Sequence, residues 1–184
     1  MLIEHKQDKL INAIIYFVTN TKSCGKTKLF KLLYFLDFEH FSITGRSVTG
    51  LEYFAWPMGP VPRVLNDELD SPSEELSNSL QVAKKNAFNG KEMLDITPVH
   101  EFKPDNFSKR ELNLLKKLCV EYRNSYANDM VEATHLENLP WHKVYEEEGR
   151  KQELIPYELA LKGSEYDQII KNVIENKEFM ENYH

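Results

Sequence analysis

Few residues of this chain could act on a substrate, and they are widely spaced. Asp37 comes first, because it lies in the apolar run LFKLLYFLDFEHF at residues 29–41, where an unpaired carboxylate would have a raised pKa. His40 and Cys24 are the only groups that could complete a catalytic site with it. The competing interpretation is structural: Asp37 either pairs with Arg46 or caps the turn that follows its helix. We favour the structural role, since buried ion-pair networks also shift pKa values.

Other motifs that suggest chemistry are incomplete. The segment Cys24-Gly25-Lys26-Thr27 ends like a phosphate-binding loop, but position 20 is Asn rather than Gly and no apolar strand precedes it. We therefore interpret it as a loop that enters a helix with solvent-facing lysines. The six histidines lack metal-ligand spacing, and the two cysteines form no C-x-x-C pair. Cys119, between apolar neighbours, is typical of a packed helix. The sequence predicts no catalytic residue, no metal and no cofactor.

The amino-acid composition and net charge limit the number of cores and the kinds of partner that we expect. The 184 residues are 41% hydrophobic, which is enough for one core and short for two. A net charge of −6 disfavours binding to nucleic acid by bulk attraction to phosphate. No stretch approaches the ~18 apolar residues of a membrane span, and the N-terminus lacks the plan of a secretory signal. We expect a cytoplasmic protein that does not bind membranes and has a protein as its partner.

Helical spacing of apolar residues predicts most of the chain. The expected helices cover residues 5–19, 26–42, 62–69, 109–123, 127–136, a piece that opens at Pro140-Trp141, and 165–176. Gly45 supplies the stop for the second helix, and Ser108 with Glu111 forms a capping box before the fourth. In the second helix, Lys28, Lys31 and Glu39 share one narrow polar side. We expect one domain over residues 1–184, with a core at about 8–160, a C-terminal helix within 164–176 and a frayed tail at 177–184.

Strand signals are fewer. Residues 51–56, LEYFAW, alternate as a short strand does, and the Gly and Pro residues of 57–62 should prevent its continuation. The polar segment 70–79 is expected to be a mobile loop. Asn89-Gly90 predicts the turn of a hairpin within 80–99. The predicted fold class is α+β and predominantly helical: a compact single domain of about six to eight helices with a small antiparallel sheet of about three strands.

The segment KLFKLLYFLDFEHFSITGRSVTGLEYFAWPMGPVP resembles the signature of the Panacea domain, the SocA-like antitoxin family also known as phage-associated GepA-like proteins. Later blocks resemble the family in the same order: Phe107-Ser108 with Glu111, Thr134-His135 to Pro140-Trp141, and residues 155–158. The resemblance covers roughly residues 8–160. Positions that match the family pattern are Lys31, Leu32, Tyr34, Asp37, Gly45, Gly59, Pro60, Val61, His135 and Trp141.

The resemblance implies a non-catalytic bacterial or prophage antitoxin that neutralises a cognate toxin by direct contact. It implies that the shared residues hold the fold, and with Arg46 we assign this structural role to Lys31, Tyr34, Asp37, Gly45, Gly59, His135 and Trp141. We expect toxin contact at the 56–63 corner, through Trp56, Met58, Pro60, Val61 and Arg63, and also at 70–79 and 80–99. Since no DNA-binding extension is evident, no nucleic acid is expected to bind. The alternative function is an adaptor that delivers the toxin to an ATP-dependent protease, which would then be a further partner.

Overall fold

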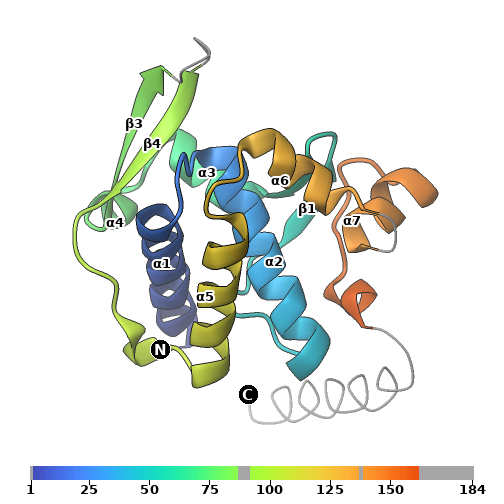
Figure 1. Cartoon of the computed structure of the whole chain (residues 1–184), viewed down its shortest axis with the longest axis horizontal. Helices are drawn as coiled ribbons and strands as arrows, with labels where there is room; N and C mark the ends of the chain where they lie inside the picture. Colours follow the sequence, from blue (N-terminus) through green and yellow to red (C-terminus); the bar gives the residue numbers. More distant parts are fainter. Residues whose placement is uncertain (1, 87–91, 137–138, 162–184) are drawn as a thin grey trace.

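A computed structural model describes residues 2–86, 92–136 and 139–161 (Figure 1). Three of the sequence predictions fall outside these ranges: the Asn89-Gly90 turn, the helix at 165–176 and the tail at 177–184.

The long helices α1 (Leu2–Asn20), α2 (Lys26–Thr44) and α5 (Lys109–Tyr122) lie side by side (Figure 1). Helix α2 is central, and every residue from Lys28 to Phe38 is buried, so its neighbours cover it on all sides. Gly45 ends α2 as predicted: it adopts a left-handed conformation with φ 67° and donates its N–H to the carbonyl of Phe41. Helix α5 begins with the predicted Ser108–Glu111 capping box.

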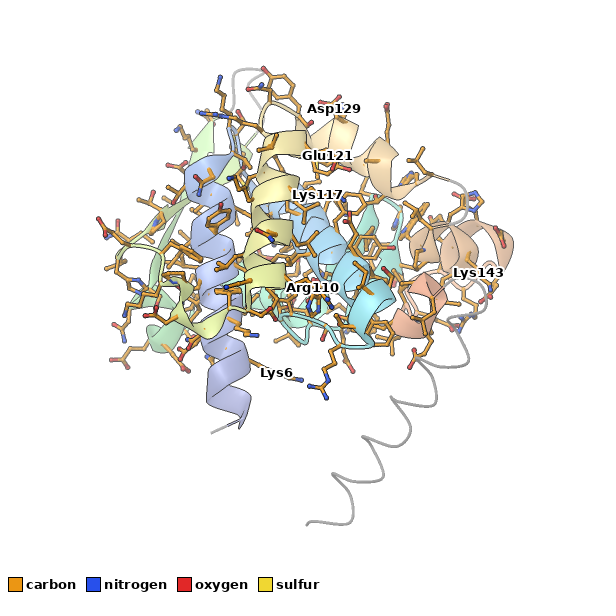
Figure 2. The ribbon with its side chains drawn as sticks, turned by 60° about the horizontal axis from the view of Figure 1, so that its bottom comes forward. Lys6, Arg110, Lys117, Glu121, Asp129 and Lys143 are labelled. Atoms are coloured by element: carbon orange, nitrogen blue, oxygen red, sulfur yellow. The ribbon has the colours of Figure 1, made fainter. Side chains whose placement is uncertain are left out.

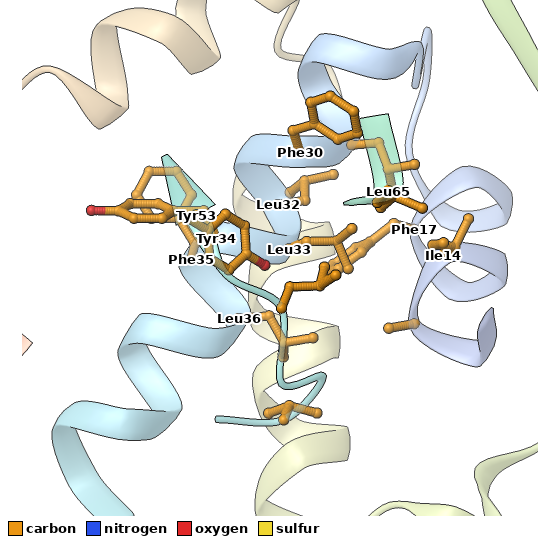
Figure 3. Close-up of a cluster of buried hydrophobic side chains, with 14 of the residues drawn as sticks. Ile14, Phe17, Phe30, Leu32, Leu33, Tyr34, Phe35, Leu36, Tyr53 and Leu65 are labelled. Atoms are coloured by element: carbon orange, nitrogen blue, oxygen red, sulfur yellow. The ribbon is translucent and has the colours of Figure 1, made fainter. Parts of the chain in front are cut away.

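The core is formed where these helices meet α3 (Arg63–Asp70). Ile14 and Phe17 of α1, Leu33 of α2 and Leu65 of α3 gather in one apolar cluster (Figure 3). All four side chains are almost fully buried. Side chains from three successive helices thus contribute to one cluster of buried residues.

Shorter helices cover the other side of α2. They are α6 (Ala127–Thr134), α7 (Pro140–His142) with the π-helical turn η2 (Lys143–Glu147), and the 3₁₀ turn η3 (Tyr157–Ala160). A further 3₁₀ turn, η1 (Pro104–Asn106), lies against α1. Pro140 stands in the first turn of α7, where its missing N–H costs no hydrogen bond. The segment at 70–79 was predicted to be a mobile loop, but it contains the helix α4 (Glu74–Ser77). Ser73 caps α4, and Leu76 packs into the core.

The predominantly helical α+β class is confirmed, but the strands form two separate antiparallel pairs rather than one sheet of about three. They are β1 (Tyr53–Trp56) with β2 (Gly59–Pro62), and β3 (Leu80–Asn86) with β4 (Glu92–Pro98). The second pair confirms the hairpin predicted at 80–99. In the first pair, the segment at 153–155 adds hydrogen bonds along the free side of β1, so it comes close to being a third strand there.

Residues 59–62 were expected to stop the first strand, yet they form β2. The reason is the register. The N–H of Ala55 donates to the carbonyl of Glu153, and the carbonyls of Ala55 and Tyr53 accept from Gln152 and Ile155. These backbone groups of Tyr53 and Ala55 therefore point away from β2. Pro62 and Pro60 lie opposite these two residues, at positions where the pair exchanges no hydrogen bond. A proline there lacks only an N–H that would point outward, and the hairpin tolerates it.

Candidate functional site at the tip of the first hairpin

Lys28 and Lys31 of α2 were predicted to face solvent, and this is wrong: their side chains are 0% and 1% exposed. A helical projection places them on a polar side, but α6 and β2 pack over that side. The long methylene stems of the two lysines are buried, and each ammonium reaches at least one backbone carbonyl. These two buried bases therefore have to be explained by their partners.

Lys28 satisfies all three of its N–H donors. Its Nζ donates to the carbonyls of Lys22 at 2.9 Å, Ser125 at 2.8 Å and Arg123 at 3.3 Å. These carbonyls follow the C-terminal ends of α1 and α5, where helices leave backbone acceptors without partners. Burial lowers the pKa of Lys28, and the nearby cysteines and Asp129 oppose that shift. Lys28 thus joins two helix ends beneath the start of α2.

Replacing Lys28 with methionine should lower the free energy of unfolding by about 2 kcal/mol, because three buried carbonyls would lose a donor while the apolar stem is kept. Chemical denaturation of the purified variant measures this loss. Lys26→Met is the matched control, since Lys26 pairs with an Asp70 whose side chain is 59% exposed, and such surface pairs contribute little. Equal stability of the two variants would contradict the role of Lys28.

Lys31 lies one turn further along α2, beneath the tip of the first hairpin, and its ammonium has one acceptor among the residues that the structure describes. Its Nζ donates to the carbonyl of Pro60 at 2.8 Å. Burial lowers the pKa of Lys31 to about 7. Gly59 leaves room for this side chain: a Cβ at that position would lie 2.8 Å from Cε of Lys31 and 2.7 Å from Oγ1 of Thr134. The absence of a side chain at residue 59 is therefore what allows Lys31 to pass under the hairpin.

An aromatic stack supports the same hairpin from the side of α6 and α7. The ring of His135 lies parallel to Trp141, with centroids 3.8 Å apart, and Tyr145 stacks on Trp141 at 4.7 Å. Trp141 is 1% exposed; its indole N–H donates to the carbonyl of Trp56 at 3.0 Å, and its backbone N–H donates to the hydroxyl of Tyr34. The tip of the hairpin is thus anchored to α2 from below and to Trp141 from the side.

His135 is the second base in this corner. Its Nε2 is buried and has no hydrogen-bond partner within residues 2–86, 92–136 and 139–161. Burial lowers the pKa of His135, and the positive charge of nearby Lys31 lowers it further, while Glu146 acts in the opposite direction. Lys31, Tyr34, Gly59, His135 and Trp141, which were assigned a structural role from the family pattern, therefore meet at one place.

The remaining structural residues lie toward the C-terminal end of α2. Asp37 is fully buried and accepts four hydrogen bonds, from the backbone N–H groups of Val48 at 2.8 Å and Thr49 at 2.7 Å, and from the hydroxyls of Thr49 at 2.5 Å and Tyr53 at 2.8 Å. Burial raises the pKa of Asp37, and these donors oppose the rise. Of the two structural alternatives, the cap on the following turn is confirmed and the ion pair with Arg46 is wrong, because the Arg46 side chain is exposed.

The five residues proposed to contact a toxin do not form one patch. Met58, 58% exposed, and half-buried Trp56 lie at the tip of the hairpin, whereas exposed Arg63 begins α3 at the other end of β2. Pro60 and Val61 are buried. Arg63 packs over the ring of Phe54, with Cζ 5.0 Å from its centroid.

Sequence reasoning missed two residues of this region. Leu136, 61% exposed, follows His135 directly, two residues after Thr134, which lies against Gly59. Tyr145 lies four residues after Trp141, and that spacing of two aromatic residues in a helical segment could have indicated the stack. We call Trp56 and Met58, which lie at the tip of the hairpin, the tip surface.

Residues 29–142 match the family model described as "Antitoxin SocA-like, Panacea domain". Comparison with curated proteins and with solved structures finds no match to the chain. The matched segment runs from the first turn of α2 to the end of α7, and so contains both the hairpin corner and the Asp37 cap. It is shorter than the expected coverage of residues 8–160. No helix in the described ranges is both long enough and apolar enough to cross a bilayer.

Proposed function

Because the chain belongs to the SocA-like antitoxin family defined by the Panacea domain, we propose that it is an antitoxin, which neutralises a protein toxin by binding it and catalyses no reaction. In this proposal the tip surface is the centre of the contact. Family membership supports the function, and the geometry of the first hairpin supports the place.

The observation that carries this choice of surface is the fixed backbone beneath exposed apolar side chains. Met58 is open to solvent, while the residues on either side of the turn are held by Trp141 and Lys31. A surface that is already ordered loses little conformational entropy when it binds, and so retains more of its contact energy. Exposed apolar anchors on such a surface are typical of the centre of protein interfaces.

The outer face of α5 offers a contrast. Arg110, Lys117 and Glu121 lie along it (Figure 2), and Lys117 pairs with Glu39 of α2 at 2.6 Å. Charges of both signs lie there, as on an ordinary solvated face. We therefore place the toxin on the hairpin side rather than on the α5 side.

The β3–β4 hairpin is the second proposed contact region. It projects away from the helices (Figure 1), and its outer residues are exposed and carry weak ion pairs, Lys84 with Glu92 and Lys85 with Asp95. An exposed arm of this kind can vary without disturbing the core, and this supports a role in selecting one toxin among several. The neighbouring segment at 70–79 would contribute through exposed residues beside α4.

Met58→Asp should weaken binding of the toxin encoded beside this chain at least tenfold and abolish rescue of growth, because it places a charge at a desolvated contact. Binding is measured with purified proteins, and rescue by co-expression. Val120→Asp is the matched control, since Val120 is 73% exposed on α5 and should bind as the parent does.

Three results would count against the proposal in different ways. If the parent chain fails to rescue growth, the proposed antitoxin function is wrong. If the Met58→Asp variant binds the toxin as tightly as the parent chain, the tip surface is not the contact site, but the antitoxin function is not contradicted. A toxin level that falls only when an ATP-dependent protease is present indicates the adaptor rather than simple occlusion.

A further inference from the structure

Two buried lysines on the same helix differ in how well their charge is accommodated. Lys28 and Lys31 are both essentially inaccessible to solvent. An ammonium group has three N–H donors. Lys28 finds three carbonyls, whereas the only hydrogen bond of the Lys31 ammonium within the described ranges is to Pro60. Lys31 is therefore in a place that suits a neutral amine and does not suit a cation.

The groups that face Lys31 do not compensate its charge. Thr134 of α6 is neutral, β2 contributes backbone only, and His135 is a second base. Beyond them, His142 of α7 and Glu146 of η2 act on His135, and Glu146 is the one acid of this group and is exposed. Protonation of both Lys31 and His135 thus puts like charges beneath the hairpin.

We propose that the corner in which Lys31 and His135 meet the tip of the first hairpin is a proton-sensitive latch that opens more often as the pH falls. Opening exposes Lys31 to water, where an ammonium is well solvated, and releases residues 56–59 and Trp141 together. The latch itself is a property of the chain alone.

The direction follows from the protons bound in each state. The closed corner releases the proton of Lys31 at about pH 7, whereas an opened Lys31 keeps it up to its ordinary value of 10.5. Between these values the open state binds more protons, so opening becomes up to about tenfold more frequent for each unit by which the pH falls. Below about pH 7, Lys31 is protonated in both states and adds nothing further. His135 then extends the effect to lower pH, because its closed-state pKa also lies below its ordinary value.

Native-state hydrogen exchange of the full chain without toxin tests the latch. The reporters are the backbone amides of Trp56, Gly59 and Trp141, corrected for intrinsic exchange rates, between pH 6 and 10. Their protection should rise by up to about tenfold per pH unit above pH 7, and below pH 7 it should change only through His135. In Lys31→Met the dependence above pH 7 should disappear. A pH-independent protection in the parent, or the same dependence in Lys31→Met, would overturn the latch.

The amides of Val48 and Thr49, which Asp37 holds at the other end of α2, are the internal control. They should lack the dependence, and an identical slope there would mean that the whole domain rather than the corner responds to protons. If Lys31→Met does not fold, titration of the Lys31 side-chain carbon Cε by NMR in the parent chain decides the matter. A midpoint near pH 7 supports the latch, and a midpoint near 10.5 refutes it.

Discussion

Asp37→Ala is expected to lower the free energy of unfolding by about 5 kcal/mol, which is comparable with the total stability of a domain of this size. The substitution strands the four donors of Val48, Thr49 and Tyr53 in a buried site. It also leaves a cavity between α2 and the segment that leads to β1. We expect little soluble protein at 37 °C and a strongly lowered urea midpoint at lower temperature.

Asp37→Asn separates hydrogen bonding from volume. An amide is nearly isosteric with the carboxylate but has one acceptor oxygen, and its NH₂ group must face a donor. We expect a loss of about 3 kcal/mol with the fold retained. Arg46→Ala is the control: the Arg46 side chain is exposed and pairs with no carboxylate in the part of the chain that is described, so its loss should stay within about 0.5 kcal/mol. Equal losses in the free energy of unfolding for Asp37→Asn and Arg46→Ala would contradict the cap and support an ion pair between the two residues.

Gly59→Ala is the second large effect, with an expected loss of about 4 kcal/mol. Gly59 has φ 93°, which L-amino acids other than glycine rarely adopt, and the added Cβ would approach Thr134 and Lys31 to within 3 Å. Because the buried Lys31 cannot move aside without losing its bond to Pro60, the hairpin itself must shift. Thermal or chemical denaturation gives the loss, and the fluorescence of Trp141 reports whether the tip has moved.

A matched glycine makes this prediction specific. Gly149 also has a positive φ, of 66°, but a Cβ there would meet nothing within 4 Å. Gly149→Ala should therefore lose only the conformational term, about 1 kcal/mol. If Gly59→Ala and Gly149→Ala lose the same amount, close packing beneath the hairpin contributes nothing.

The elements that could be predicted are those whose signals are local. The stop at Gly45, the Ser108–Glu111 box and the hairpin within 80–99 each depend on residues a few positions apart. The cap made by Asp37 was one of two alternatives, because a carboxylate in an apolar helix needs donors and the nearest available ones follow that helix. Local rules identify such features without knowledge of the fold.

The features that escaped prediction depend on residues far apart in the chain. Lys28 is buried because carbonyls 95 and 97 residues away come within reach of its ammonium, and nothing near residue 28 indicates this. In the sequence, the two prolines of β2 indicate the end of a strand. The hairpin tolerates them because a segment around residue 153 occupies the other side of β1, and that segment is far away in the chain. His135 and Trp141 were selected by family resemblance, but their stacking follows from the path of α6 and α7.

The proline pair in β2 also limits how another chain can approach. The outward edge of this strand offers no amide at residues 60 and 62, and the carbonyl of Pro60 is occupied by Lys31. The opposite margin of the sheet is closed by residues 153–155. An incoming polypeptide consequently cannot extend this sheet by main-chain pairing, which also removes a common route to aggregation. A protein that binds here must therefore be recognised by the shape and chemistry of side chains. Its affinity can consequently change with each single substitution on this surface.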